Sequence, residues 1–414
     1  MKTIHRETGS YSHRPENTVA KAKEHRFTIG IDSLTKLPDS YTDGVPIYRV
    51  NEAKEMAKCH RALHLWADSP APLHRPPREN YGKGMTEMQS KASALMEAVE
   101  RFCGQQFDRE AVVDNPDAAK WEEAVSLSTF RFPPLPAKCR KCPAFNRQCF
   151  QDLDLTAEEW VRGYSLIHDE PRLIPAAVVY YPYLSGSKKS FVFNDTGGLS
   201  AGNTLEEAIL QGLCEVIERE ALHRVFTLED KQALEYVDYS LSDNKHLQDF
   251  HHRVLPSEKV FSFCIKNGEN DAQVPVCTAF VCYEEEKPVF FGGSGANLDA
   301  SVGMVRALTE MEQQKVRQKQ LRVFDKKDLI KVDQNKEAGR KPKRLLKKEG
   351  RNIEEELEVI VDQLRELGFE VIVVDLTHPK IQIPVVRVIV PELIAYSGNL
   401  IRKTYLQELM ALFG

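Results

Sequence analysis

The chain has 414 residues, of which 42% are hydrophobic and 28% are charged, and its formal net charge at pH 7 is -5. This length is enough for a large core and predicts about two or three lobes. The negative charge argues against general nucleic-acid binding, no stretch is apolar for the length of a membrane helix, and the polar N-terminus has no signal-peptide pattern. We therefore expect a cytoplasmic protein that acts on neither nucleic acid nor a membrane.

Three segments along the chain repeat one polar spacing. Polar residues recur at positions i, i+4 and i+7, in Ser93/Glu97/Glu100, then Gln211/Glu215/Glu218, then Arg306/Glu310/Gln313. Positions three and four apart share one face of a helix, so each set predicts a helix with a polar stripe. Apolar residues at helical spacing occupy the other face and predict its burial. Runs rich in β-branched residues, such as 370–374 and 385–390, alternate with these helices, so the fold class is mixed α/β.

A glycine-rich segment precedes each stripe, at residues 81–84, 197–203 and 292–297. The first two are followed by the capping boxes Thr86-x-x-Gln89 and Thr204-x-x-Glu207, which are typical of helix starts. We expect these segments to be loops in which glycine lets the backbone approach a phosphate. The helix start that follows each loop offers N–H donors to the same anion.

The stripes together carry five carboxylates, from Glu97, Glu100, Glu215, Glu218 and Glu310. Carboxylates gathered in one place repel one another unless cations lie among them, and hard cations that bring a polyphosphate are suitable partners. The pattern predicts a nucleotide–Mg²⁺ site. The alternative is exposed helices with surface ion pairs such as Glu97 with Arg101, but this does not explain why the arrangement occurs three times.

These segments resemble the signature blocks of the YcaO family. The similar stretches are residues 83–101, 199–219 and 306–313, with flanking likeness at 44–49, 375–377 and 384–391. The resemblance covers roughly residues 20 to 395. It implies a YcaO-type α/β fold whose helices carry a convergent carboxylate cluster, with ATP and Mg²⁺ as cofactors. It also implies that a peptide-backbone amide oxygen is activated by phosphorylation and the carbonyl carbon is then attacked by a nucleophile.

The resemblance implies a role for each matching residue. The five carboxylates would hold Mg²⁺, while Arg219 and Arg306 would contact phosphate oxygens. Further contacts to metal, ribose or phosphate would come from a polar set: Ser93, Ser200, Asn203, Gln313, Lys83, Arg14 and Thr18. One departure from the family pattern is Asn297, where many members have a His, and this bears on acid–base or substrate contacts.

The family contains two main reactions. An adjacent Cys, Ser or Thr side chain as nucleophile produces an azoline ring, and external sulfide produces a thioamide. Azoline-forming members generally end in a Pro-rich tail, whereas residues 406–414 contain no proline and predict an amphipathic helix. The chain is therefore similar to thioamide-forming members, which often work with a TfuA-type partner. In methanogenic archaea the same activity is linked to thioglycine formation in a host enzyme.

Several alternatives stay open from sequence. They are an azoline-forming cyclodehydratase of modified-peptide biosynthesis, and a nucleotide-binding accessory protein that regulates a partner. A di-iron carboxylate protein is disfavoured because its helices normally carry Glu-x-x-His, whereas both motifs here are Glu-x-x-Glu. A peptide or protein substrate and a homodimer are what the family implies.

We expect residues 1–65 to form an N-terminal α/β segment that contributes to the nucleotide site, residues 66–395 the catalytic domain, and residues 396–414 a C-terminal helix. An insertion at about 130–155 contains Cys139, Cys142 and Cys149, a spacing that predicts a zinc or iron–sulfur site, with Cys103 as a candidate fourth ligand. An ordinary loop is the alternative. The basic residues between 315 and 351 predict a solvated helix end and loop, or else a docking surface for an acidic protein.

Overall fold

The computed structural model describes the chain in segments: residues 9–38, 44–53, 79–105, 112–115, 120–126, 129–131, 159–181, 183, 196–226, 233–254, 258–268, 271–283, 289–318 and 352–393. Within them the fold is mixed α/β, which confirms the predicted class. The predicted C-terminal helix and the Cys139, Cys142 and Cys149 site lie outside these segments. Among the helices that are described, none is both long enough and apolar enough to cross a bilayer.

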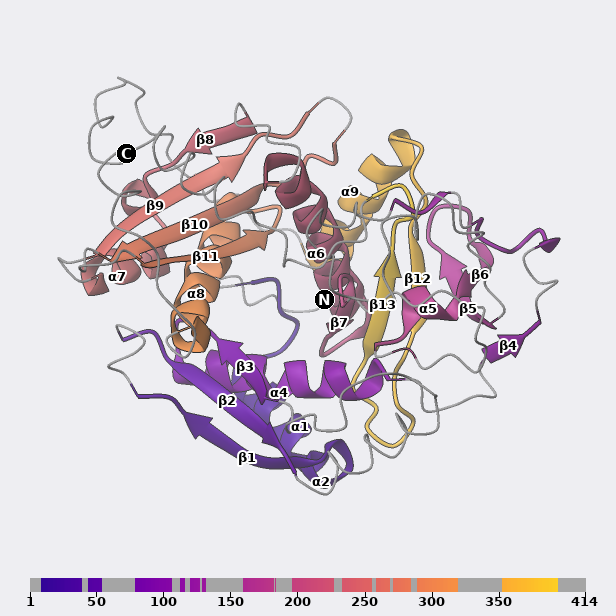
Figure 1. The fold of residues 1–414 in the computed structure, drawn as a ribbon, viewed down its shortest axis with the longest axis horizontal. Helices are drawn as coiled ribbons and strands as arrows, with labels where there is room; N and C mark the ends of the chain where they lie inside the picture. The colour runs from indigo at the N-terminus through magenta and orange to yellow at the C-terminus, as the bar shows by residue number, and fades with distance from the viewer. Residues whose placement is uncertain are drawn as a thin grey trace, which may run out of the picture.

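Three sheets built from antiparallel strand pairs organise the molecule (Figure 1). The N-terminal sheet has the order β1-β2-β3, with β1 at Ile31–Lys36, β2 at Ile47–Glu52 and β3 at Glu79–Lys83. The second has the order β11-β10-β9-β8, with β8 at Leu234–Tyr236, β9 at Glu258–Ile265, β10 at Val276–Tyr283 and β11 at Val289–Ala296. The third has the order β4-β5-β12-β13-β7, with β6 paired to β5. Its strands are β4 Val112–Asp114, β5 Glu159–Ser165, β6 Glu170–Pro175, β7 Leu199–Ala201, β12 Ile372–Asp375 and β13 Val385–Ile389.

The three predicted stripes lie on the three longest described helices. These are α4 (Glu87–Cys103), α6 (Leu205–Phe226) and α8 (Ala300–Gln318), and each directly follows a strand, β3, β7 or β11. The remaining helices are α1 Pro15–Glu24, α2 Arg26–Ile29, α5 Ala176–Val179, α7 Lys245–Arg253 and α9 Ile353–Glu366, with a 3₁₀ turn at Tyr239–Leu241. The periodicity argument is thus confirmed for all three.

The glycine-rich segments are largely strands, not loops. Gly82 lies in β3 and Gly293 in β11. A Cβ atom on Gly82 would lie 2.0 Å from the carbonyl oxygen of Ser90, and one on Gly293 would lie 2.2 Å from that of Ala307. Each contact is with the helix that follows the strand. The prediction of loops is therefore wrong for the first and third segments, because there glycine lets a helix lie directly on its own strand.

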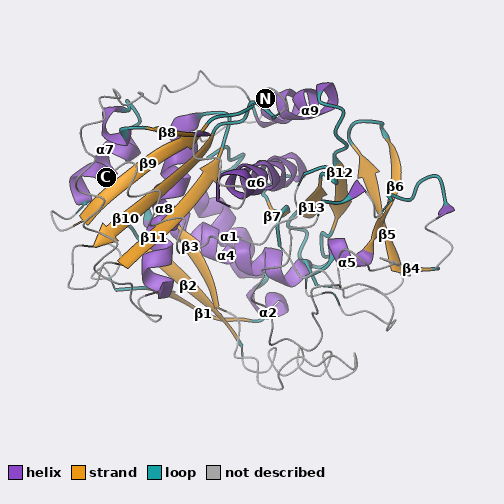
Figure 2. Ribbon diagram, turned by 45° about the horizontal axis from the view of Figure 1, so that its top comes forward, coloured by secondary structure: helices purple, strands orange, loops and turns teal. Residues whose placement is uncertain are grey.

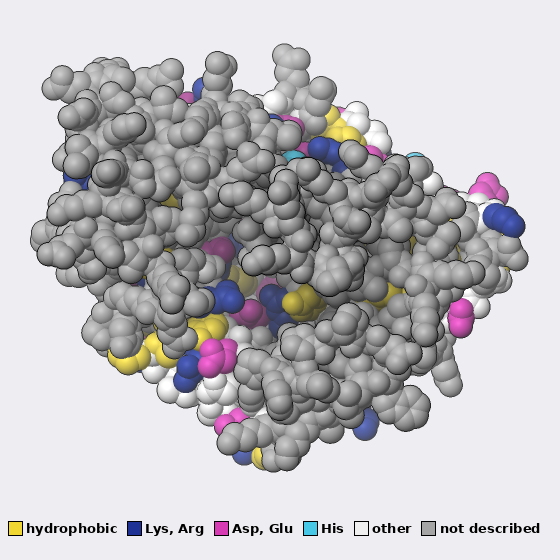
Figure 3. All heavy atoms as spheres, in the orientation of Figure 1, with side chains coloured by type: hydrophobic (Ala, Val, Ile, Leu, Met, Phe, Trp, Pro, Cys, Tyr) yellow, Lys and Arg dark blue, Asp and Glu magenta, His cyan; other side chains and the backbone are white. Residues whose placement is uncertain are grey.

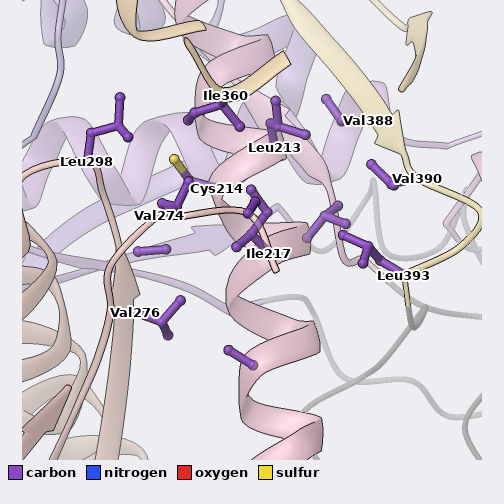
Figure 4. Packing of buried hydrophobic residues seen from close by; sticks show 14 of the residues in the cluster. Leu213, Cys214, Ile217, Val274, Val276, Leu298, Ile360, Val388, Val390 and Leu393 are labelled. Carbon is purple, nitrogen blue, oxygen red and sulfur yellow. The ribbon is translucent and has the colours of Figure 1, made fainter. Parts of the chain in front are cut away.

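Helices α6 and α8 pack on opposite faces of the second sheet (Figure 2). Successive β10 residues point to opposite faces, so Val276 joins the cluster around α6 and Cys277 the cluster around α8. On its other side, α6 packs against α9 and β13, where Leu213 lies among apolar side chains that include Ile360 and Val388 (Figure 4). Helix α6 is thus buried on several sides, which holds its polar stripe in place.

The start of the predicted basic run is buried. Lys315, in α8, has no exposed side-chain surface, and its Nζ donates to Glu258 at 3.0 Å and to Glu312 at 2.8 Å. The prediction of a solvated helix end is wrong for this residue, because two carboxylates balance the ammonium and make its burial tolerable. Residues 319–351 lie outside the described segments.

Candidate active site

A hollow near the centre of one face of the molecule contains both basic and acidic side chains (Figure 3). In the same orientation, α4, α6 and α8 surround that position (Figure 1). The charges of the three helices also act on one another: that of Glu215 on α6 raises the pKa of Glu100 on α4, and that of Glu310 on α8 raises the pKa of Glu218 on α6. The structure therefore brings side chains from the three stripes into one region.

The stripe of α4 is attached to strand β3. The backbone N–H of Tyr81 donates to Glu97 Oε2 at 3.1 Å, and that of Lys83 donates to Ser93 Oγ at 3.3 Å. Arg101 lies 3.7 Å from both Glu97 and Glu100. The first turn of α4 has the predicted capping box, since Thr86 and Gln89 exchange both hydrogen bonds. Strand β3 and ion pairs within α4 thus hold this stripe in position.

Strand β3 also binds the stripe of α8. The Nζ atom of Lys83 lies 2.6 Å from Glu310 Oε2, and the side-chain amide of Gln313 donates to the carbonyl of Tyr81. Burial alone would raise the pKa of Glu310, but the charges of Lys83 and Arg219 outweigh it and lower that pKa. Lys83 therefore stabilises Glu310 as a carboxylate.

Two residues of the α6 stripe, Glu215 and Gln211, contact guanidinium groups. Arg219 lies 3.0 Å from Glu215, and Arg306 Nη1 donates to Gln211 Oε1 at 2.6 Å. Ser294 of β11 donates to Glu218 at 2.5 Å. Burial nevertheless raises the pKa of Glu218, and the nearby charge of Glu310 raises it further.

Glu100 is the carboxyl in the least favourable surroundings. Burial raises its pKa well above the usual range, and the charges of Glu215 and Glu97 add to the shift, while Arg101 and Arg387 oppose it. About a fifth of its side chain, 19%, remains exposed. Such a group carries its charge readily only when another cation comes near.

The N-terminal segment reaches the start of α6. Thr18 Oγ1 donates to Asn203 Oδ1 at 2.7 Å, and Asn203 Nδ2 donates to Glu207 at 2.8 Å. Ser12 donates to Glu207 through its N–H at 2.8 Å and its hydroxyl at 2.6 Å. The predicted second capping box is thus only half correct. Thr204 accepts from the Glu207 N–H at 3.2 Å, but the carboxylate of Glu207 holds the N-terminal segment.

Two predicted residues are not joined to this network in the parts of the chain that the structure describes. The side chain of Arg14 is exposed, just before α1. Ser200 is buried in β7, opposite Val386 of β13. Their roles stay predictions. Cys103 is buried at the end of α4, where burial raises its pKa to about 11.

Comparison with known proteins identifies the family. Residues 81–394 match the sequence model described as YcaO cyclodehydratase, ATP- and Mg²⁺-binding. The chain belongs to the YcaO family. An uncharacterized protein of Methanothermobacter thermautotrophicus is 26% identical over 406 residues, which cover 93% of this chain and 95% of that protein. An uncharacterized protein of Mycobacterium tuberculosis is 29% identical over 130 residues, 30% of this chain and 26% of that protein.

Two solved structures share the fold. A heterocyclase in complex with substrate and cofactor aligns with a TM-score of 0.72 and 23% identity over 94% of this chain, which spans only 53% of the heterocyclase. YcaO from Methanopyrus kandleri, bound with AMPPCP and Mg²⁺, aligns with a TM-score of 0.64 and 22% identity over 94% of each chain. ATP and Mg²⁺ are the cofactors of the family.

The carboxylates of the YcaO site are candidates to hold Mg²⁺. Among the described residues, no three His, Cys, Asp or Glu side chains lie close enough together to hold one ion. The predicted carboxylate cluster is therefore looser than expected, because Arg101, Arg219 and Lys83 pair with its members. The donors still fit a hard cation, because they are carboxylate oxygens. Burial and neighbouring carboxylates raise the pKa values of Glu100 and Glu218, so a bound cation would stabilise their ionised forms.

Two residues of this region, Arg387 and Tyr11, were not predicted from the sequence. Arg387 is buried in β13 within electrostatic reach of Glu100, and its signal was a single charge inside the apolar run 384–391. Tyr11 lies near Arg306 and Glu207, and burial raises its pKa. No spacing pattern includes Tyr11, so the sequence offered no sign of it.

Proposed function

We propose that this YcaO protein uses ATP and Mg²⁺ to phosphorylate the oxygen of a peptide-backbone amide, and that an external sulfur nucleophile then converts the amide to a thioamide. The observation that carries the proposal is that three stripes far apart in the sequence come within electrostatic reach of one another, since Glu310 acts on Glu218 and Glu215 acts on Glu100. Acidic groups forced together under burial are typical of a site that works with bound cations.

The proposed roles follow the position of each side chain. Mg²⁺ would be held by the five stripe carboxylates: Glu97, Glu100, Glu215, Glu218 and Glu310. Phosphate oxygens would be met by Arg219, Arg306 and Lys83. Neutral contacts to the nucleotide or metal would come from Ser93, Ser200, Asn203, Gln313 and Thr18, with Arg14 as an outer contact.

The chain's own residues prepare this chemistry by orienting charge. Gln211 holds Arg306 and Glu215 holds Arg219, so both guanidinium groups are positioned before a nucleotide arrives. Bound Mg²⁺ supplies the charge that offsets the phosphates. Transfer of the Lys83 ammonium from Glu310 to a phosphate would free that carboxylate for the metal.

The terminal phosphoryl group of ATP moves to the amide oxygen, hydrosulfide adds to the carbonyl carbon, and the carbon–oxygen bond breaks. The oxygen leaves with phosphate. One amide, one ATP and one hydrosulfide thus become one thioamide, one ADP and one phosphate. Arg219 and Arg306 would stabilise the negative charge of the leaving phosphate.

Thioamide formation is the preferred outcome because residues 406–414 contain no proline, which is similar to thioamide-forming members and unlike azoline-forming ones. The second candidate is azoline formation, which the family description as a cyclodehydratase favours. In that case the nucleophile is a neighbouring Cys, Ser or Thr of the substrate.

The proposal includes partners. A peptide or protein is the substrate, a TfuA-type protein delivers sulfide, and the enzyme is a homodimer. Light scattering of the purified protein would test the dimer. A pull-down with a TfuA-type protein, repeated with Lys343 and Arg344 both reversed in charge, would test whether the basic run is its docking surface, and unchanged affinity would exclude that surface.

The deciding experiment is incubation with ATP, Mg²⁺, sulfide and candidate host proteins, followed by peptide mass spectrometry. A mass gain equal to replacement of oxygen by sulfur, dependent on ATP and sulfide, is expected. A loss equal to one water would establish azoline formation instead. Bound nucleotide with no mass change in any substrate would support the accessory role. Metal analysis of anaerobically prepared protein tests the separate proposal of a zinc or iron–sulfur site at Cys139, Cys142 and Cys149.

A further inference from the structure

Two cysteines face each other across neighbouring strands of the second sheet. Cys264 of β9 is the direct cross-strand partner of Cys277 of β10. Their sulfur atoms lie 3.2 Å apart, and both residues are free thiols. The pair lies on the face of the sheet that packs against α8.

The backbone geometry suits a bond between these sulfurs. Directly opposed residues of antiparallel strands have Cα atoms about 4.5 to 5.5 Å apart, and a disulfide requires about 4.4 to 6.8 Å. Bond formation would shorten the sulfur separation from 3.2 Å to about 2.05 Å. Rotation about the side-chain bonds can supply this movement without a shift of the strands.

The two thiols differ in access. Cys277 is fully buried, whereas Cys264 is only partly buried. The hydrogen bond with Cys264, together with burial, raises the pKa of Cys277 well above the usual range. Cys277 therefore keeps its proton, and Cys264, the more accessible of the two, is the sulfur that a reagent meets first.

We propose that Cys264 and Cys277 form a reversible oxidation site, which closes to a cross-strand disulfide by exchange with a small-molecule disulfide. The Cys264 thiolate attacks one sulfur of the reagent and expels the other as a thiolate. Cys277 then attacks the Cys264 sulfur, expels the second thiolate and gives up its proton. The two protein thiols lose two electrons and two protons, and the reagent is reduced to two thiols.

Oxidation of the two cysteines should alter a contact at the start of α8. Cys277 Sγ lies 3.4 Å from the carbonyl oxygen of Ala300, the first residue of α8, and donates to it. A disulfide has no S–H, so this contact is lost when the bond forms. Since α8 carries Arg306 and Glu310, the oxidised protein should bind nucleotide about two- to fivefold more weakly. This part of the inference rests on the proposed function.

The test uses the full chain in mixtures of oxidised and reduced glutathione. Remaining thiols are alkylated after quenching, and peptides are identified by mass spectrometry. We expect a linked peptide pair containing Cys264 and Cys277, which dithiothreitol separates again. Cys214 is the internal control, because it is also buried and burial raises its pKa to about 12, and it should stay a free thiol. Glutathione that remains on Cys264 without linkage would overturn the proposal.

The Cys264→Ser variant and nucleotide binding complete the test. This variant should form no linked peptide and should lose the dependence of nucleotide affinity on the glutathione ratio. Equal affinity of the reduced and the linked wild-type protein would overturn the coupling to α8. Failure of the reduced wild type to bind any nucleotide would instead contradict the proposed function, while the peptide result would still decide the oxidation site.

Discussion

Helix α8 carries two groups of charged residues that differ in how well they are balanced. Toward its end, Lys315 donates to Glu258 and Glu312, and none of the three side chains is more than 1% exposed. Nearer the start of the helix, on its polar stripe, Glu310 contacts Lys83, and these side chains are 21% and 26% exposed. The first group is closed to solvent, whereas the second is partly open to it.

The difference separates a structural ion network from a functional one. At Lys315 the cation is supplied by the fold itself, and the three side chains are closed to solvent, so no ligand reaches them. In the second group, burial raises the pKa of Glu218 and the charge of Glu310 raises it further, while burial and the charges of Glu215 and Glu97 raise the pKa of Glu100. We expect substitutions in the first group to reduce stability, and substitutions in the second to reduce activity.

The largest effect is expected for Glu218→Gln, which keeps volume but removes the charge. ATP turnover should fall at least about a thousandfold, while the circular dichroism spectrum and Tm remain close to those of the wild type. Glu220→Gln is the matched control on the same helix, because Glu220 pairs with Arg131 at 3.0 Å outside the site, and its turnover should stay unchanged. Normal turnover by Glu218→Gln would remove Glu218 from the site.

Lys315→Met tests the other side of the comparison. It leaves two buried carboxylates without their cation, which costs about 3 to 5 kcal/mol. Urea unfolding should show a clearly lower midpoint, while the folded fraction should retain the wild-type affinity for nucleotide. Replacing Glu258 and Glu312 by Leu in the same variant should recover much of the loss. A midpoint equal to that of the wild type would show that the network does not stabilise the fold.

Lys83→Met should separate the two kinds of effect within the site. Its ion pair with Glu310 is partly exposed, so the loss of stability should be at most about 1 kcal/mol. The loss of a positioned cation should lower kcat/KM for ATP about a hundredfold. Lys91→Met provides the control, since Lys91 lies on the same strand–helix unit but pairs with Glu87 at 3.6 Å. Equal kcat/KM for both variants would exclude Lys83 from phosphate contact.

Periodicity was enough to predict the helices that carry the three polar stripes. The stripes of α4, α6 and α8 follow from local spacing, and the Thr86 capping box follows from the chemistry of four consecutive residues. Contacts between distant parts of the chain depend on the fold. Lys83 and Glu310 are 227 positions apart and Thr18 and Asn203 are 185 apart, so no local pattern could pair them.

The errors have a common cause. Glycine at 82 and 293 was expected to serve a ligand, but it serves the contact between strand and helix. Lys315 was expected in solvent because Lys is rarely buried. One of the two carboxylates that balance its charge, Glu258, lies 57 positions away in the sequence. Each of these residues has a role that only its tertiary neighbours define.

The smallest expected effect is a change in Tm, and its sign should differ between a carboxylate of the site, Glu100, and a carboxylate of the Lys315 group, Glu312. Burial and the charges of Glu215 and Glu97 raise the folded-state pKa of Glu100. Both states are protonated below the unfolded-state pKa of about 4.3, and the cost of ionisation grows as pH rises toward the folded-state pKa. Glu100→Gln removes that cost, so in nucleotide-free protein it should raise Tm by about 2 °C at pH 7.

This gain should disappear as pH falls toward 4, since the wild-type side chain is then protonated as well. Glu312→Gln, on α8, should instead lower Tm at pH 7, because it weakens a buried contact with Lys315 of 2.8 Å. Thermal scans of both variants across pH would measure this. A lower Tm for Glu100→Gln at pH 7 would mean that Arg101 and Arg387 already balance Glu100, and that its carboxylate does not need a further cation.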